Sequence, residues 1–203
     1  SSLHTEFNYK EKQYNFFIPF SLPNETIIAR PTHLSSEGIR AEIIEIKEPS
    51  IDRIDPQCRH FFKCGGCTLQ HWKFNNYKNW KFKKVSTPIL KLSSNTHVKP
   101  IMISSLKSRR HAKFMAKKIE TTTIVGFNEY RTNFITKINE CIIIDEQLVK
   151  LINNIEKPLN NLLQIGETIS IHANLLDNGI DLLIDGLEKI PLVQFSELNE
   201  TLL

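Results

Sequence analysis

The sequence lacks several features that define other classes of protein. No run of about 18 apolar residues exists, so no segment is expected to span a membrane. Residues 1–12 lack the apolar core of a signal peptide, which predicts a cytoplasmic protein. There is no internal repeat or low-complexity segment, and the composition of 40% hydrophobic and 24% charged residues excludes wholesale disorder. The 203 residues therefore predict one or two ordinary globular domains.

Carboxylates are missing from one long stretch of the chain. Asp55 is followed by no acidic residue until Glu120, whereas residues 56–119 contain fifteen of the 26 lysines and arginines. The rest of the chain holds the other eleven basic residues and all 22 acidic residues, so the two parts carry +15 and −11. A solvated face usually mixes both signs of charge, and clustered cations release counterions when they bind phosphates. The pattern therefore predicts a nucleic acid as partner.

The N-terminal region reads as short strands joined by turns. Strands are predicted at residues 16–20, 26–30 and 39–46, where β-branched and apolar residues gather or alternate. The segments Leu22-Pro23-Asn24-Glu25 and Ser35-Ser36-Glu37-Gly38 read as turns, because Pro fixes φ and Asn tolerates the left-handed region. This pattern predicts a small β-barrel of the oligonucleotide-binding type, although composition alone fits an anonymous β-module equally well.

The remaining chain predicts helices alternating with antiparallel strands. An amphipathic helix is expected over residues 75–92, kinked or ended by Pro88. A hairpin is expected over 109–118 and 121–127, and a short strand over 134–138. Residues 145–163 have helical period, with Asp145 as N-cap and Pro158 as a limit or bend. A second hairpin is expected over 168–184, turning at Asp177-Asn178-Gly179, and residues 187–203 could begin another helix.

These patterns predict an α+β protein in three parts. Residues 1–55 are expected to form the β-barrel, and residues 56–74 a metal-binding loop. Residues 75–203 are expected to form a helix followed by a mixed α/β central domain with antiparallel strands.

Four cysteines, Cys58, Cys64, Cys67 and Cys141, are the strongest chemical signal. In a reducing compartment such cysteines are more typical of metal ligands or free thiols than of disulfides. Gly65 and Gly66 would let the loop wrap, since glycine reaches dihedrals that other residues avoid. Four converging thiolates suit either a [4Fe–4S] cluster or structural zinc.

The spacing leaves other interpretations open. His60 or His71 could replace Cys141 in a zinc site. Cys64 and Cys67 could form a redox pair, although no thioredoxin-like βαβ pattern surrounds them, and the cysteines could also be unrelated buried residues. Spacing by itself indicates metal binding and does not choose the metal.

The cysteine segment resembles a known family. Residues 49–72, including Cys58-Arg59-His60-Phe61-Phe62-Lys63-Cys64-Gly65-Gly66-Cys67, resemble the iron–sulfur signature of the RNA uracil-5 methyltransferase family, above all its 23S ribosomal-RNA branch. Ile18-Pro19-Phe20-Ser21-Leu22-Pro23-Asn24-Glu25 resembles the TRAM-domain segment of that family, with Asn24 where glycine is usual. Collinear similarities at Trp80-Lys81, Ser108-Arg109-Arg110-His111-Ala112, Val125-Gly126-Phe127 and Cys141 extend the resemblance from about residue 14 to the end.

This resemblance implies that Cys58, Cys64, Cys67 and Cys141 bind a [4Fe–4S] cluster, and that a TRAM β-barrel touching RNA precedes a central α/β domain. Members of the family also have a Rossmann-like domain that binds S-adenosylmethionine and carries a catalytic cysteine and a general base. The cysteine attacks C6 of uracil before methyl transfer to C5.

The parts of that catalytic domain are not found here. The sequence has no Gly-rich strand-to-helix turn and no cysteine beyond the four. We therefore expect the Rossmann-like domain to be absent and the chain alone to be inactive. It would then be a fragment, a decaying copy or one part of a split enzyme with a separately encoded methyltransferase half.

Basic residues on both sides of the cysteines are expected to contact RNA. A loop folded around a cluster would bring them into one patch, in which Arg109 and Arg110 grip phosphates through planar guanidinium groups. Phe61, Phe62 or Trp72 could stack on unpaired bases, whereas Trp80 and Phe114 are expected in the core. The residues expected to bind RNA are Lys73, Lys81, Lys84, Arg109, Arg110 and Lys113.

The sequence thus favours an RNA-binding, [4Fe–4S]-carrying portion of an RNA (uracil-5-)-methyltransferase that acts on ribosomal RNA. The alternative is a stand-alone nucleic-acid-binding module with zinc. An iron–sulfur electron carrier is disfavoured, because no second cluster signature is present.

Overall fold

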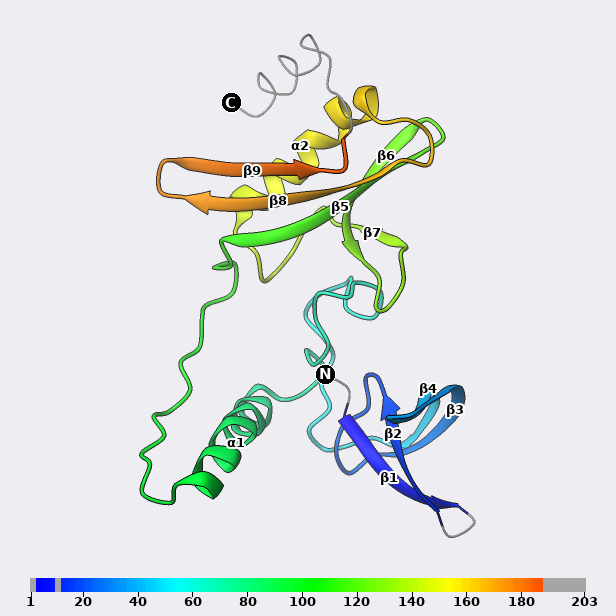
Figure 1. Cartoon of the computed structure of the whole chain (residues 1–203), viewed down its shortest axis with the longest axis vertical. Helices are drawn as coiled ribbons and strands as arrows, with labels where there is room; N and C mark the ends of the chain where they lie inside the picture. Colours follow the sequence, from blue (N-terminus) through cyan, green and yellow to red (C-terminus); the bar gives the residue numbers. More distant parts are fainter. Residues whose placement is uncertain (1–2, 10–11, 188–203) are drawn as a thin grey trace. The chain divides into compact units, whose positions relative to one another are not determined.

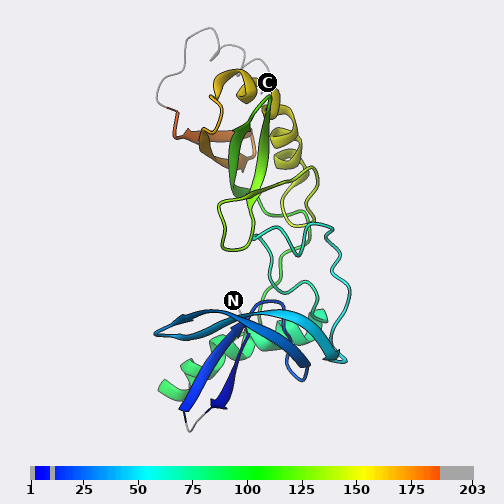
Figure 2. The same cartoon turned by 90° about the vertical axis from the view of Figure 1, so that its right-hand side faces the viewer.

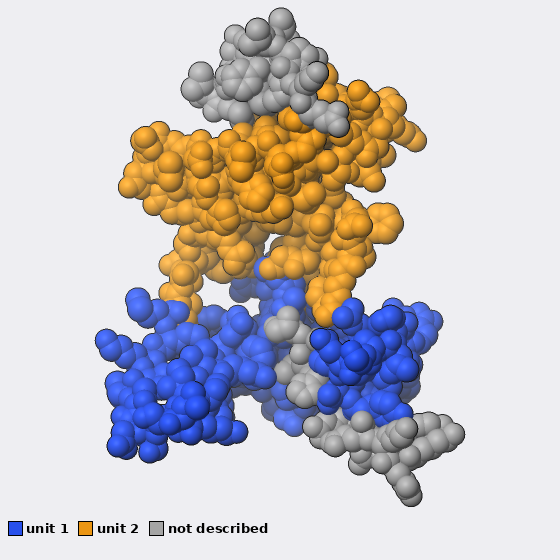
Figure 3. Space-filling view, in the orientation of Figure 1, with its two compact units in different colours: residues 1–57, 67–102 blue, residues 58–66, 103–203 orange. Residues whose placement is uncertain are grey.

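The computed structural model describes residues 3–9 and 12–187, and the chain divides into two compact units (Figure 3). The first unit contains Ser1–Gln57 and Cys67–Met102, and the second contains Cys58–Gly66 and Ile103–Leu203. The boundaries expected at residues 55 and 75 do not coincide with this division. The expected metal-binding loop is shared between the units, and the helix expected beside the central domain lies in the first unit. In the described residues, no helix combines the length and hydrophobicity needed to cross a bilayer.

The first unit is built on a four-stranded sheet (Figures 1 and 2). Its strand order is β1-β2-β4-β3, with β1/β2 and β3/β4 antiparallel and β2/β4 parallel. The barrel expected from the sequence thus appears, in the part of the chain that the structure describes, as a sheet with β1 and β3 at its edges. Strand β1 was not predicted, although Leu3, Phe7 and Tyr9 alternate with the polar His4, Glu6 and Asn8. The strands are β1 (Leu3–Tyr9), β2 (Lys12–Ile18), β3 (Thr26–Ser35) and β4 (Gly38–Glu48).

The two predicted turns of this unit are confirmed. Asn24 adopts the left-handed region with φ 61°, as expected for the residue after Pro23 in the turn before β3. Ser36 and Glu37 form a two-residue connection between β3 and β4. Local turn chemistry therefore fixed both connections.

Helix α1 (Phe74–Leu92) also belongs to the first unit. The helix agrees with the range predicted over residues 75–92 and continues to Leu92 past Pro88, so of the two effects expected of this proline the helix does not end there, and the kink stays a prediction. Tyr77 and Trp80 are half-buried, but Val85 is 57% exposed. The predicted apolar face is thus partly covered at Trp80, whose ring centroid lies 5.7 Å from that of Trp72, and is open to solvent at Val85.

The second unit is a five-stranded antiparallel sheet covered on one face by a helix (Figures 1 and 2). The strand order is β7-β6-β5-β8-β9, and both predicted hairpins are confirmed as β5/β6 and β8/β9. The elements are β5 (His111–Ile119), β6 (Thr122–Asn128), β7 (Ile135–Lys137), α2 (Glu146–Leu162), β8 (Thr168–Leu176) and β9 (Gly179–Asp185).

The core of this unit lies between the sheet and α2. Strand β5 turns Ala112, Phe114 and Ala116 into it and leaves His111 and Lys113 exposed, as the alternation predicted. Helix α2 contributes a buried stripe of leucines and isoleucines, and each such side chain contributes about 1.5–3 kcal/mol by leaving water. These observations confirm the α+β class with antiparallel sheets.

The ends of α2 follow local rules only in part. Asp145 caps the helix, accepting a 2.9 Å hydrogen bond from the Gln147 N–H as predicted. Pro158 lies inside the helix, which continues to Leu162. The helix expected over residues 187–203 falls, apart from Leu187, outside the described residues.

Candidate functional site

The cysteine loop of the second unit, residues 58–66, docks on the connection between β6 and β7. The Gly65 N–H donates to the Asn128 carbonyl at 2.9 Å, and the Tyr130 N–H donates to the Lys63 carbonyl at 3.3 Å. Cys64 forms a β-bridge with Glu129. These backbone bonds fix Cys64 against the end of the sheet.

Gly65 is required here for space. A Cβ atom at Gly65 would lie 2.8 Å from the Asn128 carbonyl oxygen, inside van der Waals contact. Positive φ angles among the glycines occur at Gly38, Gly166, Gly179 and Gly186, so the expected use of unusual dihedrals at Gly65 and Gly66 is not what the structure shows. The close approach of two backbones explains Gly65 instead.

Arg59 connects this loop to the segment that carries Cys141. Its Nη2 donates to Asn139 Oδ1 at 2.7 Å, and its Nε lies 2.7 Å from Glu140 Oε1. Arg59 directly follows Cys58, and Glu140 directly precedes Cys141. One side chain therefore links two cysteine-bearing segments that are 80 residues apart in sequence.

Two of the sulfurs have surroundings that suit a metal-bound thiolate. Cys64 and Cys141 are half-buried against the same hydrophobic core. The Gly66 N–H points to Cys64 Sγ and the Ile143 N–H points to Cys141 Sγ, both at 3.4 Å. A metal-ligating sulfur carries negative charge, and an N–H group directed at it lowers the energy of that charge. The donor set therefore fits the predicted group chemically.

The four predicted ligands are divided between the units. Cys58, Cys64 and Cys141 belong to the second unit, whereas Cys67 belongs to the first. Across residues 3–9 and 12–187, no group of three or more His, Cys, Asp or Glu side chains is arranged to hold a metal ion. The structure thus brings three of the cysteines into one unit without assembling a metal centre.

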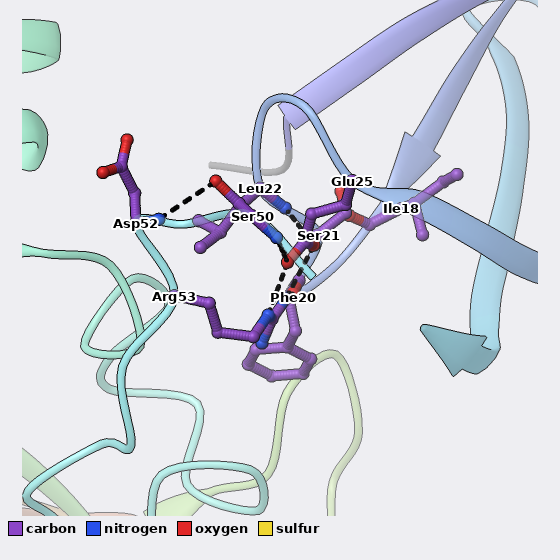
Figure 4. Close-up of polar contacts among 8 residues, drawn as sticks. All are labelled: Ile18, Phe20, Ser21, Leu22, Glu25, Ser50, Asp52 and Arg53. Carbon is purple, nitrogen blue, oxygen red and sulfur yellow. Dashed lines mark hydrogen bonds and ion pairs between the residues drawn. The ribbon is translucent and has the colours of Figure 1, made fainter. Parts of the chain in front are cut away.

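A buried ion pair joins the turn before β3 to the segment that leads into the cysteines (Figure 4). Arg53 Nε and Nη2 lie 2.5 and 2.7 Å from Glu25 Oε1 and Oε2, and Nη2 also donates to the Phe20 carbonyl at 2.8 Å. Glu25 accepts further bonds from the backbone N–H groups of Leu22 and Ser50. Burial raises the pKa of Glu25, but these hydrogen bonds outweigh it and the pKa is lowered overall.

His71, which the sequence offered as an alternative zinc ligand, is fully buried in the same unit. Its ring lies edge-on to Phe20 with centroids 6.2 Å apart. Burial, and after it the nearby Arg53, lower the pKa of His71 to about 4. The ring is therefore neutral at pH 7 and packs as part of the interior.

Of the predicted RNA-contacting lysines of the first unit, Lys73 is the N-cap of α1, and Lys81 and Lys84 lie within the helix. Lys81 Nζ lies 5.7 Å from the ring centroid of Tyr77 and 5.5 Å from that of Trp80, and Lys84 Nζ lies 5.6 Å from Trp80. Lys73 is exposed at the N-cap. The helix carries five lysines and no acidic residue, so this end is a cationic and aromatic surface.

The predicted basic residues of the second unit have different settings. Arg110 donates to the Leu175 carbonyl at 2.9 Å and forms an ion pair with Asp177 at 2.7 Å, so its guanidinium group is already engaged. Arg109 and Lys113 are exposed, and Lys113 pairs across β5 and β8 with His172. The basic residues expected to form a single patch thus belong to two different units.

The predicted stacking aromatics differ in exposure. Phe61 and Trp72 are buried, so the expectation that they would stack on bases was wrong. Phe62 is 58% exposed, and Phe114 is fully buried as predicted. Functional reasoning from sequence missed Glu25, Arg53, Arg59 and Glu140, because ion pairs between distant segments leave no local signal.

Comparison with known proteins places the chain among RNA methyltransferases. No family model matches the sequence. An RNA methyltransferase of Brucella melitensis is 30% identical over 175 residues, which are 86% of this chain and 41% of that protein. The 23S rRNA (uracil(1939)-C(5))-methyltransferase RlmD of Acinetobacter baylyi is 31% identical over 181 residues, which are 86% of this chain and 39% of that protein.

A solved structure shares the fold. The tRNA (uracil-54, C5)-methyltransferase of Pyrococcus abyssi, in complex with S-adenosyl-L-homocysteine, matches with a TM-score of 0.52 and 18% identity. The match covers 87% of this chain and 44% of that one. The chain therefore belongs to the family of RNA methyltransferases that includes the 23S rRNA uracil-5 methyltransferases, which confirms the resemblance found in the sequence. It spans about two fifths of the length of these relatives.

Proposed function

We propose that this chain is the RNA-binding, [4Fe–4S]-carrying portion of an S-adenosylmethionine-dependent RNA (uracil-5-)-methyltransferase that acts on ribosomal RNA. The observation that supports it most is the placement of Cys58, Cys64 and Cys141 in one unit, with Arg59 linking their segments. The relationship to 23S rRNA methyltransferases supports the substrate class.

Cys58, Cys64, Cys67 and Cys141 would hold the cluster. When bound, the cluster would supply four iron–thiolate links that fix the positions of the cysteine segments. The N–H groups of Gly66 and Ile143 would stabilise the negative charge on two of the sulfurs. The sheet β1–β4 would serve as the TRAM-type module that touches RNA.

The basic residues of each unit would position RNA through phosphates. Lys73, Lys81 and Lys84 are carried by or adjoin the acid-free helix α1, and Arg109 and Lys113 are exposed on the second unit. Arg110 would contribute less, because Asp177 and the Leu175 carbonyl already engage its guanidinium group.

Methyl transfer would need a cofactor-binding domain and a catalytic thiol. All four cysteines are assigned to the cluster, so we expect no methyl transfer by the 203 residues alone. Activity would depend on a methyltransferase domain that binds S-adenosylmethionine, either within a longer chain or as a separately encoded half.

The test is metal analysis of the 203-residue chain purified without oxygen, combined with RNA binding. We expect iron and acid-labile sulfide in equal amounts, a broad visible absorbance band and binding to ribosomal RNA fragments. Stoichiometric zinc with RNA binding would instead favour the zinc-containing nucleic-acid module. A chain that holds neither metal nor RNA would overturn both proposals.

A further inference from the structure

The connection between β6 and β7 exposes the side chain of Phe134 to solvent. Phe134 is 73% exposed, although Phe127 from the same β6–β7 segment packs with its ring centroid 5.0 Å from that of the buried Phe114. A single exposed apolar side chain is ordinary on a protein surface. Phe134 differs from such a residue in two respects, which are the hydrogen bonds that fix its backbone and the cationic residues of the adjoining segments.

The backbone of Phe134 is fixed by hydrogen bonds on both sides. Its N–H donates to Thr132 Oγ1 at 3.1 Å, and its carbonyl accepts from the Glu129 N–H at 2.8 Å. The Thr132 N–H donates to the Glu129 carbonyl at 3.2 Å, so hydrogen bonds within the turn 129–134 fix its conformation. The exposed ring is therefore presented by a preorganised turn, which reduces the entropy lost when a ligand stacks on it.

Two cationic residues belong to the same turn and to the cysteine loop docked on it. Arg131 lies in the left-handed region with φ 58°, and its guanidinium carbon is 5.2 Å from the ring centroid of Tyr130. Lys63 is exposed on the docked cysteine loop, which the Tyr130 N–H joins at the Lys63 carbonyl. Within the described residues, neither Arg131 nor Lys63 forms an ion pair.

The one carboxylate of the turn is directed elsewhere. Glu129 Oε1 accepts a 3.2 Å hydrogen bond from the Thr136 hydroxyl on β7. The turn and the docked loop thus carry an exposed aromatic ring together with two cationic residues that form no ion pair within the described residues. Proteins that bind single-stranded nucleic acid commonly combine these two features, because bases stack on aromatic rings while cations bind the backbone phosphates.

We propose that Phe134 is a stacking site for an unpaired RNA base, with Arg131 and Lys63 binding the adjacent phosphates. The site extends over the turn 129–134 and the docked cysteine loop, where Phe62 offers a second exposed ring. This inference rests on the proposed RNA-binding function and adds to it a preference for unpaired over paired RNA.

The experiment measures binding of a fluorescently labelled single-stranded oligoribonucleotide, and of its duplex, to the full 203-residue chain. Phe134→Ala should weaken single-strand binding about 5- to 100-fold and leave duplex binding unchanged. Phe134→Tyr should retain wild-type affinity, because it keeps the ring. Leu183→Ala is the matched control, since Leu183 is a 60% exposed apolar residue of the same unit on β9.

Arg131→Gln should lower the steepness of the salt dependence by about 0.7 in log–log slope, the amount expected for one lost phosphate contact. Equal single-strand affinity for wild type, Phe134→Ala and Leu183→Ala would overturn the stacking site while the RNA-binding function stands. A loss of self-association in Phe134→Ala with unchanged RNA affinity would also overturn it, by assigning the ring to a protein contact. Absence of RNA binding by the wild-type chain would defeat the proposed function itself.

Discussion

Arg53 and Glu25 form an ion pair in which the glutamate side chain is only 1% exposed and the arginine side chain 18% exposed. Glu25 lies in the turn that precedes β3, and Arg53 lies in the segment that leads to the first cysteine (Figure 4). The pair therefore connects the segment that precedes Cys58 to the turn before β3, and both belong to the first unit. The contribution of this ion pair to the free energy of unfolding can be measured with variants.

Arg53→Ala should destabilise the first unit by about 3–5 kcal/mol, because it leaves a buried carboxylate without its partner. Arg30→Ala removes a matched but exposed pair with Glu42 in the same unit and should cost at most about 1 kcal/mol. Both tryptophans, Trp72 and Trp80, belong to the first unit, so tryptophan fluorescence during urea unfolding reports on it selectively. Equal losses for the two variants would show that burial of the pair is unimportant.

Stability of the first unit should fall in mild acid. The pKa of His71 is lowered to about 4 from an ordinary 6.5, mainly by burial and then by Arg53, so the unfolded chain binds the proton more readily. This contribution is complete above pH 6.5 and is lost as the pH falls toward 4. It amounts to at most about 3 kcal/mol. The lowered pKa of Glu25 adds a further loss as its carboxylate becomes protonated.

The measurement is the urea midpoint of tryptophan fluorescence at several pH values between 7.5 and 4.5. His71→Gln should flatten the slope between pH 6.5 and 4.5, whatever its effect on absolute stability. The same slope in wild type and variant would assign the acid sensitivity to other groups.

Cys141→Ser should abolish retention of iron and sulfide. The change distinguishes a four-cysteine cluster from a local zinc site that uses His60 or His71, because only the cluster needs the distant thiol. His71→Gln is the paired variant and should leave the iron content unchanged. Unaltered visible absorbance in Cys141→Ser would remove that residue from the ligand set.

Arg59→Ala should shorten the lifetime of a bound cluster without unfolding the chain. The Arg59–Glu140 pair is more than half exposed, so its loss should cost at most about 1 kcal/mol of stability. It nevertheless links the segments of Cys58 and Cys141, and release of iron to a chelator should become faster. Lys107→Ala, which removes the similarly exposed pair with Glu146, is the control and should not change the release rate.

RNA affinity of the chain should fall steeply with salt. About six phosphate contacts predict a log–log slope near −4 for single strands. Lys84→Gln should reduce that steepness by about 0.7, since its ammonium group is exposed over Trp80 on α1. Arg110→Gln should reduce it by less, because Asp177 already neutralises that guanidinium group. A slope near zero would show that the segregated charge does not contact RNA.

Much of the fold could be predicted because local chemistry decides it. The alternation along β5, the turn at Asp177-Asn178-Gly179 and the Asp145 N-cap depend on neighbouring residues, and all were confirmed. The ranges predicted for the two helices, 75–92 and 145–163, were also close to those observed, and each helix continues for four residues beyond its proline. Of the two effects expected of Pro88 and Pro158, an end at the proline is excluded and a bend stays a prediction.

The sequence by itself determined the acid-free basic segment, the four cysteines and the kinship with RNA methyltransferases, since these are properties of residue type and spacing. Tertiary structure decided which residues meet: Arg53 with Glu25, Arg59 with Glu140, and the cysteine loop with the turn that exposes Phe134. It also buried Phe61 and Trp72, which the sequence offered as stacking residues. The physical reason is that residue type, charge and spacing are properties of the linear sequence. Burial and ion pairing instead depend on contacts between segments that are distant in the sequence, and these contacts form only when the chain folds.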